Sequence, residues 1–250
     1  MALQYLRSLF FNTQMYVAMP VLAIVFTPLA IFSRKWAYRA CHTYCAWVIW
    51  SARWIVGLKV DIRGVPPSCE VMVAAKHQSF FDILVIFHAL PAAKFIMKRE
   101  LVWAPILGQY ALRMGCVPVS RGKRGHAIQK MLNDVASGLQ HPGQLVIYPQ
   151  GTRVAPGDHL PYKIGTGALY EQLSQDCVPV ATNIGVFWPK RGILRKPGTA
   201  VVTFLPTISA GYKVDVFMQR LERDVEKASN ALMLEAGFRG GVVVEDNPVD

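Results

Sequence analysis

Residues 73–86, VAAKHQSFFDILVI, place a histidine and a carboxylate where a buried apolar strand is expected to end. If a helix begins just after His77, Asp82 lies about one turn into it and can reach back to the imidazole. A carboxylate that accepts the Nδ1 proton fixes the tautomer and leaves Nε2 as an outward-facing base. This is the base and orienting acid of a hydrolase triad. Ser79 is close, but no G-x-S-x-G turn surrounds it, so we expect the substrate to bring the attacking hydroxyl. The alternative is structural: Asp82 caps a helix and His77 is an ordinary loop residue.

Arginine residues follow two further apolar stretches, each beside a glycine. The segment GCVPVSRG (115–122) ends with Arg121, and VIYPQGTRVAPG (146–157) contains Arg153. The planar guanidinium fork suits phosphate oxygens, and a neighbouring glycine permits close backbone approach. A single exposed arginine is usually a solvated surface charge. Two at matching positions predict a phosphate site close to His77.

These polar residues follow short runs rich in Val and Ile and bounded by Gly or Pro, which is typical of strands. Helical patterns alternate with the runs, so we expect an α/β fold: a mostly parallel mixed sheet flanked by helices. In such a sheet, chemistry tends to lie at the carboxyl ends of strands. We assign residues 58–240 to this α/β body and 241–250 to an acidic C-terminal tail. The expected strands are 58–64, 70–75, 94–98, 116–120, 144–149, 178–185 and 200–206, and the expected helices are 82–90, 103–113, 123–139, 166–175 and 213–235.

Taken in order, these motifs resemble the blocks of the glycerolipid acyltransferases, whose best-known members are the 1-acylglycerol-3-phosphate (lysophosphatidic acid) acyltransferases. Order and spacing agree from about residue 58 to 205, and four short blocks in sequence make the resemblance strong. Lys98, in FIMKREL, also matches a lysine-rich strand between the first two blocks. The blocks are matched by His77-Gln78-Ser79-Phe80-Phe81-Asp82, by Val117-Pro118-Val119-Ser120-Arg121, by Gln150-Gly151-Thr152-Arg153 and by Val178-Pro179-Val180.

The resemblance implies direct acyl transfer from a thioester of acyl carrier protein or coenzyme A to the sn-2 hydroxyl of 1-acylglycerol-3-phosphate. The product would be phosphatidic acid for phospholipid biosynthesis, with His77 as general base, Asp82 orienting it, and no cofactor or metal ion. Backbone N–H groups around Gly151 would stabilise the developing oxyanion. The residues implied for substrate binding are Lys98, Arg121, Gln150, Gly151, Thr152 and Arg153.

Two departures from the family pattern bear on the acceptor. Lys76 stands before the histidine, where asparagine is common, and Gln150 replaces the usual glutamate of the third block. Glutamine can hydrogen-bond in the same place but carries no charge. The same chemistry on another lyso-lipid, such as a lyso-ornithine lipid, therefore remains an alternative.

Two other classes of protein also remain open. One is a catalytically silent basic protein that adheres to anionic membranes. The other is a cysteine-dependent thioesterase, although Cys116 and Cys177 both precede Val-Pro, where a buried structural role is expected. The five cysteines form no C-x-x-C pair and have no histidine pair at metal spacing, so we expect reduced thiols and no metal site.

The composition favours a membrane surface. Charged residues make up only 17% of the 250 residues, yet Lys and Arg outnumber Asp and Glu by 27 to 16, which gives +11. Mean hydropathy is +0.27 and the pI about 9.6. Basic residues near an anionic leaflet contribute about 1 kcal/mol each. Nucleic acid is disfavoured because the chain has no recognised nucleic-acid motif and no long basic block.

Residues 1–57 are expected to associate with that membrane. No charged side chain occurs from Ser8 to Ser33, which is long enough to cross a bilayer and lacks the features of a secretory signal. A second apolar piece, 41–57, contains Arg53 and three tryptophans suited to the headgroup level. Because positive charge flanks the long run on both sides, we favour a helical hairpin that dips into one leaflet. A true span and a pair of soluble core helices are the alternatives. We expect the cytoplasmic face of a bacterial inner membrane.

Overall fold

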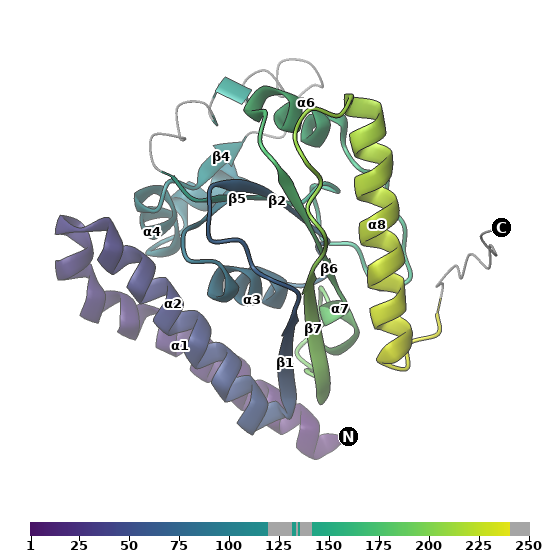
Figure 1. The fold of residues 1–250 in the computed structure, drawn as a ribbon. Coiled ribbons are helices and arrows are strands. Elements are labelled where there is room, and N and C mark those ends of the chain that lie inside the picture. The colour runs from purple at the N-terminus through teal and green to yellow at the C-terminus, as the bar shows by residue number, and fades with distance from the viewer. Residues whose placement is uncertain (120–131, 134, 136–141, 241–250) are drawn as a thin grey trace.

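The sheet lies at the centre of the molecule (Figure 1). The computed structural model describes residues 1–119, 132, 133, 135 and 142–240, and in them seven strands follow the order β1-β7-β6-β2-β5-β3-β4. Every neighbouring pair is parallel except β6 and β7, which are antiparallel. The predicted mostly parallel mixed sheet is confirmed. All seven predicted strands are present, although the strand expected at 178–185 ends at Thr182, and Ile184 already begins a helix. The strands are β1 (Leu58–Arg63), β2 (Val71–Ala75), β3 (Ala93–Lys98), β4 (Val117–Val119), β5 (Gln144–Ile147), β6 (Cys177–Thr182) and β7 (Gly198–Phe204).

Strand β2 lies in the middle of the sheet because its sequence can be buried on both faces. Its five residues, VMVAA, are all buried, and β6 and β5 pair with its two edges. Parallel strands covered on both faces have near-continuous apolar sequences. Lys76 follows, and its backbone N–H still donates to the Val180 carbonyl at 2.9 Å. The central strand therefore delivers the first block to its carboxyl end, where ligands bind in open α/β sheets.

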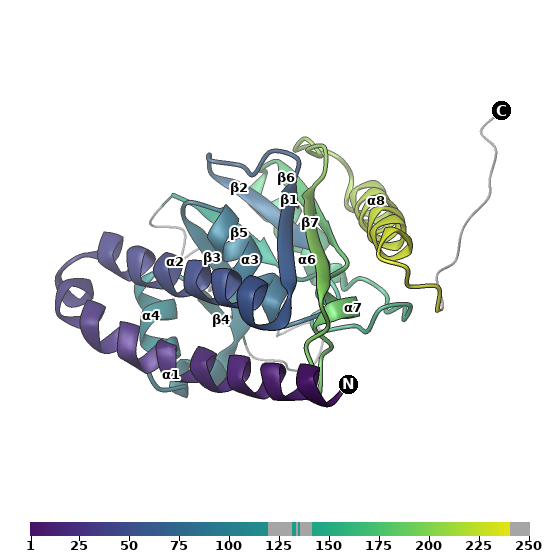
Figure 2. The ribbon, with the colours of Figure 1, turned by 90° about the horizontal axis from the view of Figure 1, so that it is seen from below.

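Helices cover both faces of the sheet, and Figures 1 and 2 place the N-terminal pair and α8 on opposite sides of it. Helix α2 packs on α3, whereas α8 packs on β6 and on α6. The predicted amphipathic helix is confirmed, because α8 buries Phe217, Leu221 and Val225 at intervals of four residues. The helices of the body are α3 (Phe81–Ala89), α4 (Leu107–Arg113), α6 (Ile164–Leu173), α7 (Ile184–Phe187) and α8 (Val214–Glu235).

One predicted helix differs in its bounds and another is largely untested. The helix expected at 103–113 begins only at Leu107, because a 3₁₀ turn (Arg99–Trp103) ends before Pro105 and Ile106 then adopts a φ of 66°. A proline disfavours a helical conformation at the residue before it. Of the helix expected at 123–139, only three residues belong to the described part of the chain, and the C-terminal tail also lies outside it.

The N-terminal segment forms the expected helical hairpin. Helix α1 (Ala2–Phe32) is followed, after Ser33, by α2 (Arg34–Ser51) and a π-helical turn (Ala52–Val56). The two helices run antiparallel: Phe26 and Trp36 meet near the connection, and further away the Tyr44 hydroxyl donates to Met15 O at 3.4 Å. In the described residues, α1 is the single helix long and apolar enough to cross a membrane, with a mean hydropathy of 2.2. Most of its large apolar side chains are exposed, as membrane contact requires.

A polar stripe on α1 attaches the hairpin to the body. Gln4, Ser8 and Asn12 recur every four residues and therefore share one face of the helix. The Gln4 amide donates to Arg195 O at 2.8 Å, Arg195 N–H donates to the Ser8 hydroxyl at 2.9 Å, and the Asn12 amide donates to Ile193 O at 3.0 Å. These bonds hold the exposed apolar face in a fixed orientation relative to the sheet.

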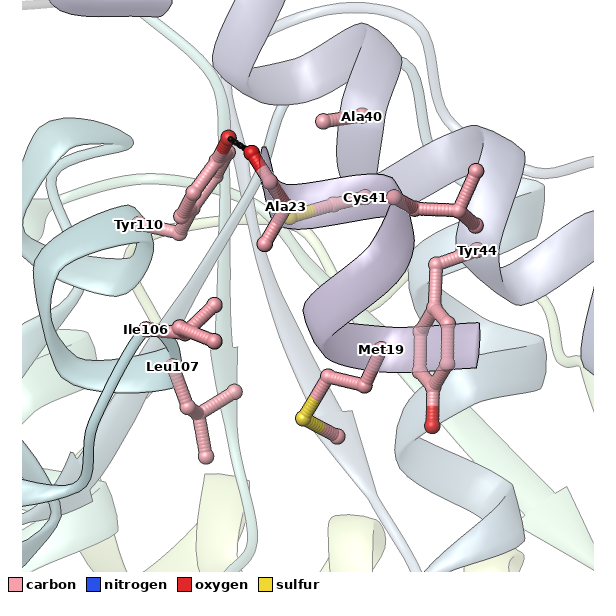
Figure 3. A pocket seen from close by; sticks show the side chains of 9 residues that line it. Met19, Ala23, Ala40, Cys41, Tyr44, Ile106, Leu107 and Tyr110 are labelled. Carbon is pink, nitrogen blue, oxygen red and sulfur yellow. Dashed lines mark hydrogen bonds between the residues drawn. The ribbon is translucent and has the colours of Figure 1, made fainter. Parts of the chain in front are cut away.

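An apolar cavity of about 60 Å³ lies where α1, α2 and α4 meet (Figure 3). The Tyr110 hydroxyl at its wall donates to Ala23 O at 3.2 Å. The hairpin and α4 therefore pack as one apolar layer around a small void. The lining residues are Met19, Leu22, Ala23, Ala40, Cys41, Tyr44, Ile106, Leu107 and Tyr110.

Candidate active site

The first block forms a turn that is closed by Asp82. This carboxylate is fully buried in the first turn of α3, where the positive end of the helix dipole favours negative charge. The backbone N–H groups of Gln78 and Ser79 both donate to Oδ2 at 2.8 Å, and Oδ1 lies 2.9 Å from His77 Nδ1. One side chain therefore shapes the turn before α3 and also contacts the imidazole. It does not cap the helix as the structural alternative expected, because the N-cap position of α3 has no side-chain cap bond.

Tyr148, which the sequence did not single out, covers one face of the imidazole. The Tyr148 and His77 rings stack with centroids 3.9 Å apart and planes 18° apart. The phenol oxygen lies 3.5 Å from Asp82 Oδ1. Burial, followed by the negative charge of Asp82, raises the pKa of Tyr148 well above its ordinary value, so this hydroxyl stays protonated. The available signal was an aromatic residue before Pro149 at a strand end, which is too common to indicate a site.

The third block is bonded directly to the first. Gly151 adopts a φ of 69°, which glycine tolerates without strain, and its N–H donates to Tyr148 O at 2.8 Å. This N–H therefore has a partner within the loop, and the expectation that N–H groups around Gly151 stabilise the oxyanion stays a prediction. Val154 N–H donates to His77 O at 2.8 Å, which holds Arg153 beside the first block. The Lys190 ammonium donates a hydrogen bond to the Arg153 carbonyl at 2.8 Å.

The other two side chains of the third block differ in their setting. Thr152 is half-buried, whereas Gln150 is only 1% exposed. The Gln150 amide donates to Leu160 O at 3.1 Å, and its Oε1 has no partner among the described residues. The amide is therefore turned into the protein. A contact between Gln150 and the substrate remains a prediction.

Of the other two cations predicted to bind substrate, Lys98 and Arg121, the structure describes only Lys98. Lys98 is the last residue of β3 and lies, like His77, at the carboxyl ends of the parallel strands. Its ammonium pairs with Glu100 at 3.2 Å. No ion pair joins Lys98 to Asp82 in the part of the chain that the structure describes. Arg121 lies outside the described residues. Of the expected pair of guanidinium groups, the described residues contain only that of Arg153, whose Nη1 donates to Lys190 O at 3.4 Å.

The lysine that departs from the family pattern points away from the imidazole. Lys76 is 2% exposed, and its ammonium lies 2.7 and 2.6 Å from the two carboxylate oxygens of Glu226 on α8. The Tyr162 hydroxyl donates to the same carboxylate at 3.0 Å. Buried charges are tolerated when they are paired and hydrogen-bonded. Lys76 thus ties the first block to α8.

The two cysteines considered as nucleophiles, Cys116 and Cys177, are buried. Burial raises the pKa of Cys116 to about 11 and that of Cys177 further, so both thiols remain protonated near neutral pH. Cys69 is exposed and lies in the loop between β1 and β2. The described residues contain no group of three or more His, Cys, Asp or Glu side chains that could hold a metal ion.

Comparison with known proteins adds to this geometry. A protein-family model described as Acyltransferase matches residues 59–183, half of the chain. The 1-acyl-sn-glycerol-3-phosphate acyltransferase of Pseudomonas aeruginosa is 25% identical over 191 residues, which cover 76% of this chain and 74% of that protein. The alpha forms from Bos taurus and Homo sapiens are 31% and 30% identical over 65% and 62% of this chain. The matches span only 59% and 57% of those mammalian relatives.

One solved structure is also similar. It is the crystal structure of the 1-acyl-sn-glycerophosphate (LPA) acyltransferase PlsC from Thermotoga maritima, with a TM-score of 0.76 over 92% of this chain and 97% of that one. At 18% sequence identity, this likeness establishes a shared fold.

Proposed function

The chain belongs to the acyltransferase family, and from that premise we propose that it transfers a fatty acyl group from an acyl thioester to the sn-2 hydroxyl of 1-acylglycerol-3-phosphate. The product is phosphatidic acid. The observation that carries this proposal is the contact of 2.9 Å between His77 Nδ1 and the buried carboxylate of Asp82, at the carboxyl end of the central strand. The four ordered blocks and the names of the relatives support the choice of acceptor.

The proposed reaction needs one base and no covalent enzyme intermediate. His77 Nε2 removes the proton of the acceptor hydroxyl while that oxygen attacks the thioester carbonyl. The tetrahedral intermediate collapses and the C–S bond breaks. The departing sulfur takes the proton from the imidazolium, so a thiol leaves and the neutral imidazole is restored. Asp82 keeps the other ring nitrogen protonated and stabilises the transient positive charge. Thioester cleavage is downhill, so the proposal requires no cofactor.

The cations at this edge of the sheet are proposed to hold the acceptor by its phosphate. Bonds of Val154 and Lys190 hold the backbone at Arg153 next to the first block. We propose that its guanidinium binds the phosphate there, within reach of the base. We assign Arg121 and Lys98 to the same task by their place in the family blocks. Fixing the phosphate positions the hydroxyl near the base, and such positioning lowers the activation barrier by removing motional freedom beforehand.

The hairpin is proposed to bring this site to the lipid. Residues 1–57 would lie in one leaflet with the exposed apolar face of α1 among the acyl chains, and residues 58–240 would form the catalytic body. The net charge of +11 favours an anionic surface. The acceptor would enter from the leaflet, and the thioester of acyl carrier protein or coenzyme A would arrive from the aqueous side. We place the protein on the cytoplasmic face of a bacterial inner membrane.

One observation favours a second candidate acceptor. Gln150 removes a negative charge from the third block, so a lyso-ornithine lipid or another lyso-lipid remains the alternative. Purified protein should be assayed in anionic vesicles with a panel of lyso-lipids and with both kinds of thioester. The proposal predicts the highest kcat/KM for 1-acylglycerol-3-phosphate. A clear preference for the ornithine lipid would replace this acceptor, and no thioester-dependent acylation of any lyso-lipid would overturn the function.

A further inference from the structure

Lys163 lies against the backbone of the third block, although it belongs to none of the four family blocks. It precedes α6, and its backbone N–H donates to Pro149 O at 2.9 Å. A Cβ atom built on Gly151 would lie 2.7 Å from Lys163 Nζ and 3.0 Å from Cε. The end of the lysine side chain therefore occupies the space that the missing side chain of Gly151 leaves open.

The charge of Lys163 is not neutralised within the described chain. Lys76 is paired with Glu226 and Lys98 with Glu100, whereas the ion pairs of the described residues do not include Lys163. The side chain is exposed, and an exposed lysine gains rotamer entropy by extending into water. Here the end of the side chain lies over a glycine instead.

The glycine that Lys163 covers is connected to the first block by two sets of contacts. Gly151 is bonded to Tyr148, whose ring stacks on His77, and two residues further along Arg153 begins the segment bonded to the His77 carbonyl. Lys163 and Arg153 thus belong to one short loop system around Gly151. A phosphate monoester carries about −1.5 to −2 charges at pH 7 and needs more than one cation to neutralise it.

We propose that Lys163 is a phosphate-binding residue of this site, which acts with Arg153 on a phosphate group carried by one of the two substrates. The inference rests on the proposed acyl transfer and deepens it. The phosphate is either that of the acceptor or that of the coenzyme A or phosphopantetheine donor, and the chemistry of recognition is the same. Lys163 binds and positions this group and takes no part in proton transfer.

The test compares Lys163→Gln and Lys163→Arg with the wild type, using substrates with and without phosphate. The acceptors are 1-acylglycerol-3-phosphate and 1-monoacylglycerol, and the donors are acyl-coenzyme A and the phosphate-free acyl-N-acetylcysteamine thioester. Lys163→Gln should lower kcat/KM about tenfold to hundredfold for combinations that contain the contacted phosphate, which is the range for a lost charged hydrogen bond. Lys163→Arg should restore most of this loss. Lys59→Ala, on the far edge strand β1, is the matched control and should change nothing.

The pattern of loss identifies the source of the phosphate. A loss that follows the acceptor phosphate assigns Lys163 to the acceptor, and a loss that follows the donor phosphate assigns it to the donor. An equal loss with every combination, or no loss, overturns the inference while leaving the acyl transfer intact. Binding of glycerol 3-phosphate and of coenzyme A, followed by ³¹P NMR, tests the inference without turnover. Unchanged affinity of Lys163→Gln for both ligands overturns it even if the wild type acylates no lyso-lipid.

Discussion

Asp82→Asn separates the two roles of the buried carboxylate. In the wild type, the backbone N–H groups of Gln78 and Ser79 lie 2.8 Å from Asp82 Oδ2. The asparagine carbonyl can take the place of this oxygen and accept the same two hydrogen bonds. The amide NH₂ then faces His77 Nδ1, which lies 2.9 Å from Oδ1. Because an amide nitrogen only donates, the imidazole must accept at Nδ1 and carry its proton on Nε2. The turn survives, but the base is in the wrong tautomer.

The magnitudes follow from these contacts. Loss of the base should lower kcat by about 10²–10⁴-fold. Two charge-assisted hydrogen bonds become neutral ones, and at about 1 kcal/mol each the free energy of unfolding should fall by roughly 2 kcal/mol. In a chain of this size that shifts Tm by about 4–8 °C. Asp82→Ala should be less stable, by about 2–6 kcal/mol, because it leaves two buried N–H groups without an acceptor.

The assay measures kcat at saturating 1-acylglycerol-3-phosphate, Tm by circular dichroism, and the histidine tautomer by ¹⁵N NMR, with the His77 signal assigned from a His77→Gln variant. Asp176→Asn is the matched control, since Asp176 also accepts a backbone N–H, from Ala210 at 2.9 Å, at the opposite end of a strand from the site. It should retain full kcat. If Asp82→Asn keeps kcat within about threefold of the wild type, the carboxylate is structural and the base assignment is refuted.

Three further predictions concern neighbouring groups. Glu226→Gln leaves the ammonium of Lys76 buried without an anion, so urea denaturation should show a loss of about 3–5 kcal/mol; a loss below about 1 kcal/mol would show that this pair does not tie the first block to α8. Tyr148→Phe keeps the stacked ring and should lower kcat less than about tenfold, whereas a loss as large as that of Asp82→Asn would give the phenol a direct role. Since burial raises the pKa of Cys116 to about 11, its thiolate is scarce at pH 8. Iodoacetamide should therefore modify the exposed Cys69 first and spare activity, and inactivation in step with Cys116 labelling would restore the thioesterase alternative.

The sequence predicted the sheet well because each strand is a short apolar run with its own boundaries. It also predicted the contact of His77 with Asp82. The two residues are five apart and a helix begins between them, which brings their side chains together regardless of the rest of the fold. In both cases the information is local. The apolar residues of α1 could also be recognised from the sequence alone. The role of Gln4, Ser8 and Asn12 could not, because it depends on the 193–195 segment, which lies against their shared face in the fold.

The features that the sequence missed depend on contacts between distant segments. Lys76 and Glu226 are 150 residues apart, and only the packing of α8 on β6 brings them together. Tyr148 reaches the imidazole because β5 pairs with β2 in a parallel register. The Gln150 amide bonds to Leu160 O because the following loop returns over it. No spacing within a single motif contains these relations.

The central claim is that the imidazole of His77 removes the proton of the acceptor hydroxyl, and His77→Ala tests it most directly. Wild type and variant, matched in Tm and in binding to anionic vesicles, should be given 1-acylglycerol-3-phosphate and an acyl thioester, and phosphatidic acid should be quantified over time. We predict that kcat of the variant falls by at least about 10²-fold with little change in vesicle binding. Phosphatidic acid formed at the wild-type rate by His77→Ala would contradict the mechanism.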